Sequence, residues 1–286
     1  MKTDADRDCM ATVNAELAAA GISPSIWVDL ANAVMEAYNA YSKGTTPSLP
    51  KYKYQASIWV SEVVPTLLGF AATANDLSHN IIALRGTVTA EEVGYDLYGW
   101  GTNIACKLPT TGSTQQIYGK VKQDLYEFYT GTDGGLVKSL ASSFNLAVKA
   151  IAQANPNKPW IVTAHSLGGA LATLGALDAA VSNIYGSAPF LATFGSLHVG
   201  DQSFATAFQK KVPVAFRVAN LSDFVPSLVS LEPYTSKDPY VHVGVEMTFI
   251  WEKWDNWANH SMEFTYLPTV RDYFSVIQYG PRKYPQ

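Results

Sequence analysis

The strongest constraint on this chain is a stretch, residues 159–180, that reads PWIVTAHSLGGALATLGALDAA. Residues 160–162 are large β-forming residues, and from Ala170 onward apolar residues recur at helical spacing. The period therefore changes from strand to helix within a few residues that include Ser166 and two glycines. This pattern predicts a buried strand, a sharp turn with a serine at the bend, and a helix.

A serine at such a bend needs small neighbours, because larger side chains two residues before and after it would collide with the strand and the helix. Ala164 and Gly168 stand at these positions, and Gly169 allows the helix to pack closely. Alanine replaces the first glycine of the usual G-x-S-x-G pattern. We interpret Ser166 as a nucleophile at a strand-to-helix elbow; the alternative is an ordinary tight turn.

Composition places the chain among globular proteins. Of its 286 residues, 48% are hydrophobic and 15% are charged, a balance that argues against disorder. The net charge is −4 and there is no cluster of Lys or Arg, so we expect no nucleic-acid partner. This length suits a single α/β domain over residues 1–286.

The cysteines and the N-terminus indicate little further chemistry. Cys9 and Cys106 permit at most one disulfide and lack a metal-ligand spacing, so we expect neither a metal nor a cofactor. Residues 1–13 carry three aspartates where a signal peptide would have positive charge and then an apolar run. No apolar stretch is long enough to span a bilayer. We expect a soluble protein without a transmembrane segment, cytoplasmic by default or secreted as a mature chain.

The order of the elements indicates an α/β fold. Residues 1–50 are expected to form a helical packing segment, and the β-rich runs 57–74 and 79–85 to pair as a hairpin. Alternation then predicts a mostly parallel central sheet with helices on both faces. The predicted helices are 140–154, 167–181 and 202–211, and the predicted strands are 160–163, 190–194, 214–219 and 241–251. Sites in such sheets lie at the carboxyl ends of strands, where the elbow serine stands.

A serine nucleophile needs a histidine base and an acid that orients the base. His79 precedes a strand, His165 is adjacent to the serine on a diverging turn, and His198 lies in a loop. His242 and His260 come late in the chain, as in the order serine, acid, histidine. His260 lies in a loop-like stretch and His242 in a strand pattern, so we favour His260 and keep His242 as the alternative.

Asp223 is the candidate acid. It follows strand 214–219 directly, in NLSDFVP, and so emerges at the same sheet edge as the elbow serine. Its alternative role is a turn aspartate that binds its own backbone. Asp201 is better explained as the N-cap of the helix that follows it. Asp178 lies in the middle of a helix with no evident partner.

An oxyanion hole requires N–H donors that point at the developing negative charge. The backbone N–H of Leu167, at the start of the helix after the serine, is one candidate. The second comes from residues 81–87, IIALRGT, where Gly86 permits a tight bend and Thr87 offers an N–H and a hydroxyl. We predict Thr87 and Leu167 as the oxyanion hole; the alternative for Thr87 is a plain strand-end turn.

Four motifs, in this order, resemble class 3 (fungal-type) triacylglycerol lipases of the α/β-hydrolase superfamily. They are LRGT, VTAHSLGGALA, ATFGSLHVGD and RVANLSDFVPSL. The resemblance implies an α/β-hydrolase fold with Thr87 at the oxyanion hole, Ser166 as nucleophile and Asp223 as acid. The family carries its histidine in a loop before the last helix, and the stretch HSMEFTY puts His260 there.

The resemblance also implies a short lid over residues 88–103. Tyr95, Leu97 and Trp100 would form its apolar underside and contact substrate, as would His165 beside the nucleophile. The alternative for the lid is a surface loop whose aromatic residues merely pack.

The predicted function is that of a serine ester hydrolase, a triacylglycerol lipase or carboxylesterase that cleaves lipid-like carboxylic esters through an acyl-enzyme. Its partners would be an ester substrate and, transiently, a lipid–water interface. Feruloyl esterase and phospholipase A1 activities use the same scaffold and are alternatives. A lipase-like interaction module without catalysis is the non-enzymatic alternative.

Overall fold

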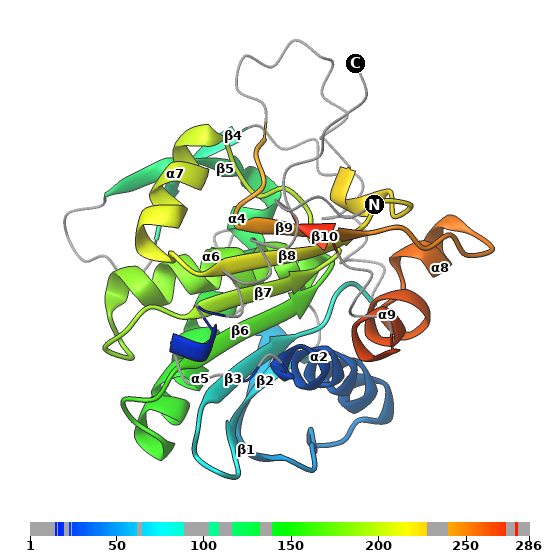
Figure 1. Ribbon diagram of the computed structural model, residues 1–286. Helices are drawn as coiled ribbons and strands as arrows, with labels where there is room; N and C mark the ends of the chain where they lie inside the picture. Colours follow the sequence, from blue (N-terminus) through cyan, green and yellow to red (C-terminus); the bar gives the residue numbers. More distant parts are fainter. Residues whose placement is uncertain are drawn as a thin grey trace.

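The computed structural model describes residues 15, 17–19, 23, 25–61, 65–88, 103–108, 116–131, 139–227, 240–272 and 278–279. A central eight-stranded sheet has the order β1-β2-β3-β6-β7-β8-β9-β10 (Figure 1). Its strands are β1 Tyr52–Ser61, β2 Pro65–Ala74, β3 Asn80–Leu84, β6 Trp160–His165, β7 Phe190–Phe194, β8 Ala215–Asn220, β9 Val245–Phe249 and β10 Gln278–Tyr279. A two-stranded sheet pairs β4 Asn103–Lys107 with β5 Ile117–Lys122.

The centre of the large sheet is parallel, as the alternation of helices and strands predicts. Strands β3, β6, β7, β8 and β9 pair in parallel, whereas β1–β2, β2–β3 and β9–β10 are antiparallel. The expected hairpin is present as β2 and β3. The β-rich run 57–74 does not form one strand. It contains the end of β1, which stops at residue 61, and all of β2, which begins at Pro65 and pairs antiparallel with β1.

Helices cover both faces of this sheet (Figure 1). Helix α2 packs against β2, β3 and β6 on one face, together with the C-terminal helices η2 and α9. Helices α4, α5, α6 and α7 contribute to the apolar cluster on the other face. Their bounds are α2 Ile26–Lys43, α4 Gln123–Thr130, α5 Leu140–Ala154, α6 Leu167–Ser182, α7 Gln202–Lys211, η1 Val225–Ser227, α8 Asn256–His260, η2 Met262–Tyr266 and α9 Leu267–Asp272.

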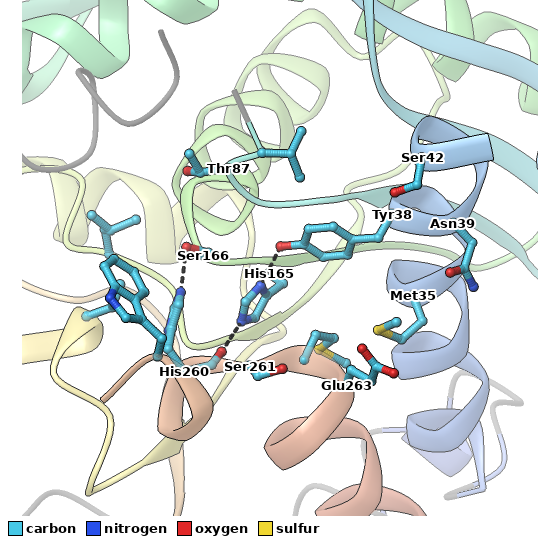
Figure 2. A pocket seen from close by; sticks show the side chains of 15 residues that line it. Met35, Tyr38, Asn39, Ser42, Thr87, His165, Ser166, His260, Ser261 and Glu263 are labelled. Carbon is cyan, nitrogen blue, oxygen red and sulfur yellow. Dashed lines mark hydrogen bonds between the residues drawn. The ribbon is translucent and has the colours of Figure 1, made fainter. Parts of the chain in front are cut away.

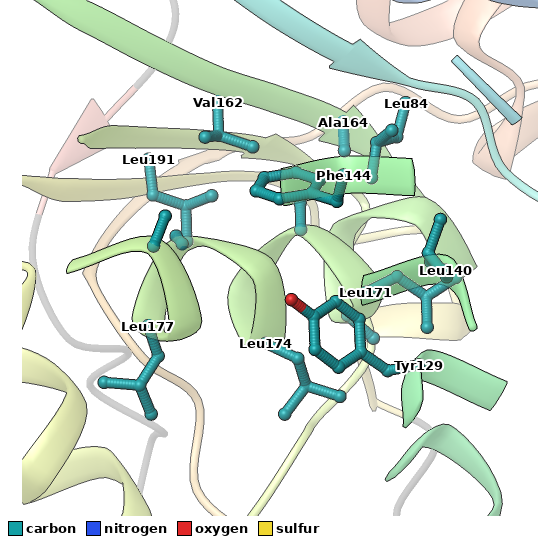
Figure 3. Packing of buried hydrophobic residues seen from close by; sticks show 14 of the residues in the cluster. Leu84, Tyr129, Leu140, Phe144, Val162, Ala164, Leu171, Leu174, Leu177 and Leu191 are labelled. Carbon is teal, nitrogen blue, oxygen red and sulfur yellow. The ribbon is translucent and has the colours of Figure 1, made fainter. Parts of the chain in front are cut away.

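Strand β6 joins the two apolar layers. Its residues Trp160, Val162 and Ala164 belong to the cluster under α5 and α6, and Figure 3 shows Val162 and Ala164 within that cluster. Ile161 belongs to the cluster under α2. This alternation follows from the period of a strand, which points successive side chains to opposite faces. Helix α6 is buried on nearly all sides, so the strand-to-helix junction is held by packing from every direction.

A polar cluster lies inside this apolar layer. Asp178 of α6 is fully buried and accepts hydrogen bonds from the Tyr129 hydroxyl (2.8 Å) and the Asn145 amide (3.2 Å). Burial and the nearby carboxylate raise the pKa of Tyr129 well above its ordinary value. The sequence showed no evident partner for Asp178, because its partners come from helices α4 and α5, which the sequence does not place beside it.

The N-terminal part of the chain contributes one long helix to the packing. Helix α2 ends at Gly44, whose φ of 63° suits glycine, and its N–H caps the helix at the Ala40 and Tyr41 carbonyls. Most residues before Ile26 lie outside the described ranges. No helix within the described ranges is long and apolar enough to cross a membrane.

Candidate active site

Ser166 lies at the bend between β6 and α6 with φ 57° and ψ −130°, a conformation that non-glycine residues rarely adopt. The small neighbours are required, because a Cβ on Gly168 would lie 2.2 Å from the Arg85 carbonyl oxygen. A Cβ on Gly169 would lie 2.7 Å from the Ser196 side chain. The backbone therefore has the strained geometry predicted for a strand-to-helix elbow, and the hydroxyl stands at the carboxyl end of β6.

His260 contacts the elbow serine from a distant part of the chain (Figure 2). Its Nε2 lies 2.7 Å from the Ser166 Oγ, and its Nδ1 lies 2.7 Å from Oδ2 of Asp223. A carboxylate only accepts, so Nδ1–H donates to Asp223, and Nε2 is the ring atom that faces the serine hydroxyl and can accept its proton. The imidazole thus lies between the hydroxyl and the carboxylate, with all three side chains buried.

Asp223 makes contacts that suit both roles that the sequence left open. It lies in the turn after β8, where Oδ1 accepts a hydrogen bond from the Val225 N–H (2.9 Å), as a turn aspartate does. Its other oxygen, Oδ2, faces His260. The backbone bond fixes the carboxylate so that the second oxygen points at the imidazole. The rival Asp201 caps α7 through the Phe204 N–H at 2.7 Å, as expected.

Tyr266 is a site residue that the sequence analysis missed. Its hydroxyl donates to Oδ2 of Asp223 at 2.6 Å and accepts from the Asn220 N–H at 3.2 Å. Burial raises the pKa of Tyr266 well above its ordinary value, and the Asp223 charge adds to this. The phenol therefore stays protonated and donating. Its signal in the sequence is only a tyrosine six residues after His260.

The sequence suggested a loop around His260. In the structure, His260 is the last residue of the short helix α8. Asp255 caps this helix by accepting from the Ala258 N–H at 2.7 Å. The side-chain amide of Asn220, at the end of β8, donates to the carbonyls of Trp251 (2.8 Å) and Asn259 (3.2 Å). The segment that carries the histidine is thus tied to the strand that leads to the acid.

The predicted oxyanion side lies at the end of β3. Thr87 lines the same cavity as Ser166, and Leu167 is the first residue of α6, so its N–H has no partner within the helix. Arg85 is fully buried; its guanidinium donates to the carbonyls of Gly86 (2.6 Å) and Leu67 (2.8 Å). These bonds hold the strand end in place. The oxyanion role of Thr87 and Leu167 stays a prediction.

A cavity of about 570 Å³ opens over Ser166 and His260. This volume lies within the range of small-molecule sites, roughly 300–1,000 Å³. About half of its lining residues are apolar or aromatic, and the others are polar. These apolar and aromatic residues come from α2, the end of β3, the turn after β7 and the helices η1, α8 and η2: Met35, Tyr38, Val88, Leu197, Val225, Trp257 and Met262 (Figure 2). No group of three or more His, Cys, Asp or Glu residues suited to a metal ion occurs in the described part of the chain.

The other predicted residues lie elsewhere or are engaged differently. His165 lines the cavity, but both ring nitrogens bond to the protein, so its predicted role in substrate binding is limited to the ring surface. His242 bonds the Pro226 carbonyl through Nε2 (2.7 Å) and stacks on His198 at 3.5 Å. The predicted lid residues Tyr95, Leu97 and Trp100 lie outside the described residues, as does Cys9.

The sheet order and the elbow define an α/β-hydrolase fold, and comparison with solved structures agrees. A lipase from Rhizopus microsporus var. chinensis superposes with a TM-score of 0.59 at 21% identity, over 81% of this chain and 77% of that one. A triacylglycerol lipase from Penicillium expansum gives 0.58 at 18% identity, over 78% and 79%. The sequence model of the family Lipase (class 3) matches residues 81–232, more than half of the chain. The protein belongs to the class 3 lipase family.

A curated relative has a longer chain. The Secreted mono- and diacylglycerol lipase 1 of Fusarium solani is 29% identical over 186 residues, which are 63% of this chain and 49% of that protein. The chain therefore spans about half the length of this relative.

Proposed function

We propose that this protein is a serine hydrolase that cleaves carboxylic esters of lipids, with Ser166 as nucleophile, His260 as base and Asp223 as orienting acid. The observation that carries the proposal is the unbroken chain of hydrogen bonds from hydroxyl to imidazole to carboxylate, with both bonds at 2.7 Å. This arrangement activates a serine hydroxyl that is otherwise a weak nucleophile. A silent interaction module would need neither these bonds nor the strained serine backbone.

In the first half of the reaction, the Ser166 oxygen attacks the ester carbonyl carbon while Nε2 of His260 takes the hydroxyl proton. Asp223 stabilises the imidazolium through Nδ1–H, and Tyr266 holds the carboxylate in place. The N–H groups of Thr87 and Leu167 would receive the negative oxygen of the tetrahedral intermediate. The intermediate collapses as the ester C–O bond breaks, and the leaving alkoxide takes the proton from His260. An alcohol departs and the acyl group remains on the serine.

The second half repeats these steps with water. His260 accepts a proton from a water molecule whose oxygen attacks the acyl carbon, and a second tetrahedral intermediate forms. When this intermediate collapses, the bond to the Ser166 oxygen breaks and the imidazolium returns a proton to that oxygen. The products are a carboxylic acid and the original serine hydroxyl. No group outside this chain is consumed other than ester and water.

The substrate class follows from the lining of the cavity. Apolar side chains such as Met35, Leu197 and Met262 line the cavity that contains the serine, and such a surface accepts an acyl chain and excludes water from the reacting atoms. The relatives' names specify glycerides: triacylglycerol for the Penicillium expansum enzyme, and mono- and diacylglycerol for the Fusarium solani one. We therefore propose acylglycerols as the substrate class.

We further propose that the turn before His260 docks on a lipid–water interface. Three large side chains around this turn are exposed: Ile250 (72%), Trp254 (70%) and Trp257 (61%). Trp257 also lines the cavity, so the exposed apolar surface is continuous with the mouth of the site. Tryptophan is favoured at lipid–water boundaries because its ring is apolar and its N–H finds a polar partner.

Replacement of the nucleophile tests the proposed activity. Ser166→Ala should lower hydrolysis of a soluble short-chain ester by about three or more orders of magnitude while the protein stays folded. Ser203→Ala is the matched control, because Ser203 is an exposed serine of α7 away from the cavity. Hydrolysis rates and melting curves of both variants decide the outcome. Wild-type rates in Ser166→Ala would overturn the proposal.

A further inference from the structure

A second chain of hydrogen bonds joins the parts of the site behind the serine (Figure 2). The hydroxyl of Tyr38, on α2, lies 2.8 Å from Nδ1 of His165, and Nε2 of His165 lies 2.8 Å from the backbone carbonyl oxygen of His260. The Gly86 N–H donates to the same Tyr38 oxygen at 2.8 Å. Four segments that are far apart in the sequence therefore meet through two side chains.

The direction of each bond can be deduced. A carbonyl oxygen only accepts, so Nε2 of His165 must carry a proton and donate to His260. Burial lowers the pKa of His165 well below its ordinary value, and the positive form of His260 adds to this, so the ring is neutral and Nδ1 has no proton. Nδ1 therefore accepts from the Tyr38 hydroxyl. Tyr38 donates to the histidine and accepts from Gly86.

We propose that Tyr38 and His165 are positioning residues that fix the oxyanion end of β3 and the backbone of the base His260 relative to the nucleophile. His165 is the residue before Ser166, so it moves with the serine. Gly86 is the residue before Thr87, so its N–H bond to Tyr38 locates the predicted oxyanion donor. This inference rests on the proposed function.

The local structure explains why such a link is needed. His260 ends helix α8, and the carbonyl groups at a helix C-terminus have no partner within the helix. His165 supplies that partner and thereby fixes the peptide that carries the base. On the other side, a Cβ on Gly86 would lie 2.5 Å from the Tyr38 oxygen and 2.7 Å from the Ser166 Cβ. The strand end and the serine thus pass each other too closely for any other residue.

A matched pair elsewhere in the chain gives the control. The Tyr52 hydroxyl lies 2.8 Å from Nε2 of His79, also in a part-buried position, but at the opposite edge of the sheet. Each tyrosine-to-phenylalanine change removes one part-buried hydroxyl that is hydrogen-bonded to a histidine, so both variants should lose a similar amount of stability. Tyr38→Phe should lower kcat on a soluble ester by about tenfold with little change in KM, below the roughly hundredfold effect of a 1 Å misplacement. Tyr52→Phe should keep kcat within about twofold of wild type, the scatter we expect without misplacement.

Variants of His165 separate the two halves of the link. His165→Gln places an amide N–H near the former Nε2 and can still donate to the His260 carbonyl. His165→Asn places an amide oxygen near the former Nδ1 and preserves only the bond to Tyr38. The link predicts that the glutamine variant retains more of kcat than the asparagine variant. Wild-type kcat in both variants would contradict the positioning link.

The failure of this inference differs from the failure of the proposed function. If the wild-type protein hydrolyses no ester and reacts with no fluorophosphonate probe, the proposed function fails. If the wild type is active and Tyr38→Phe and Tyr52→Phe have the same kcat, the positioning link alone fails. Proton NMR adds a readout without turnover: the Nδ1–H signal of His260 should shift in Tyr38→Phe and stay in place in Tyr52→Phe.

Discussion

Serine, histidine and aspartate side chains meet at two opposite edges of the large sheet, but in a different order. At the carboxyl edge, His260 lies between Ser166 and Asp223. At the other edge, the hydroxyl of Ser78 lies in the middle: it donates to Asp76 Oδ1 at 2.6 Å and lies 2.8 Å from Nδ1 of His79. In the first order, the serine hydroxyl faces an imidazole nitrogen that can accept its proton. In the second, the serine proton already points at a carboxylate.

The surroundings of the two sets are otherwise alike. Each borders a cavity, of about 570 Å³ at Ser166 and about 540 Å³ at Ser78. A histidine with a tyrosine hydroxyl at 2.8 Å occurs at both places: His165 with Tyr38 beside the first set, and His79 with Tyr52 within the second. Residue types, a cavity and buried histidines therefore do not define a nucleophile. What differs is the backbone: Ser166 has a φ of 57° next to two glycines, while Ser78 lies in a half-exposed bend and does not have a positive φ.

The largest expected effect on activity comes from replacing the histidine of each set. His260→Ala should reduce ester hydrolysis by about three or more orders of magnitude, because Ser166 loses its base. His79→Ala should leave kcat within about twofold, since it touches no reacting group, and His242→Ala should affect mainly the melting temperature. Steady-state kinetics on one soluble ester, with melting curves, checks all three. A large loss of kcat in His242→Ala with activity kept in His260→Ala would transfer the base to His242.

A smaller effect is expected at the tyrosine that holds the acid. Tyr266→Phe removes the hydroxyl that donates to Asp223 at 2.6 Å, and leaves that buried oxygen with one bond fewer. A charge-assisted bond is worth about 1.5–3 kcal/mol, so we expect kcat to fall by roughly ten- to a hundredfold. Tyr129→Phe, which removes a similar bond to Asp178 away from the cavity, is the control and should lower stability only. Equal kcat losses in the two variants would show that Tyr266 acts through general stability.

The exposed aromatic turn gives a prediction about substrate form. Replacing Ile250 and Trp254 by serine, neither of which lines the cavity, removes apolar area worth about 25 cal/mol per Å² to a lipid-bound state. We expect roughly tenfold lower rates on an emulsified acylglycerol and little change on a soluble ester, because the reacting groups are untouched. Trp59→Ser is the matched control, since Trp59 is also exposed (45%) but lies on β1. Equal losses on both substrates would contradict interfacial docking at this turn.

The smallest effects concern pH and stability. Burial lowers the pKa of His165 and His79 below the ordinary 6.5. Below pH 6.5 these two histidines bind protons in the unfolded chain, whereas in the folded protein they stay neutral until a lower pH. The free energy of unfolding should then fall by up to about 1.4 kcal/mol per pH unit for each histidine. Chemical unfolding between pH 7 and 5 should show a shallower decline in His79→Gln than in wild type. An unchanged slope would mean that His79 is charged in the folded protein.

Where the sequence predicts the fold well, periodicity and turn residues act together. The predicted helices 140–154 and 202–211 and the strand 190–194 have the same bounds as α5, α7 and β7. Pro, Asn and Gly punctuate these units, and each element shows one clear period. Between residues 103 and 131 no such pattern stands out, and β4, β5 and α4 were not predicted. Their short strands pair with each other, which a local pattern does not reveal.

The sequence predicted those site residues that lie within sequence motifs. Ser166 and Asp223 lie in recognisable strand-end patterns. The sequence favoured His260 over His242, and in the structure His260 is the histidine that contacts Ser166, whereas His242 bonds the Pro226 carbonyl. Tyr38 and Tyr266 depend on how helices α2 and η2 pack against the sheet. Tyr38 is 127 residues from His165 in the sequence, and Tyr266 is 43 residues from Asp223. No spacing within a motif marks such residues.

The most direct test of the central claim is the position of covalent trapping. A fluorophosphonate probe reacts with a serine only when a base removes its proton, so the labelled residue identifies the activated hydroxyl. Labelling of the wild-type protein, followed by proteolysis and mass spectrometry, should place the adduct on Ser166 and none on Ser78. Prior mutation of His260 should prevent the reaction. An adduct on Ser78, or labelling of Ser166 that persists without His260, would contradict the account.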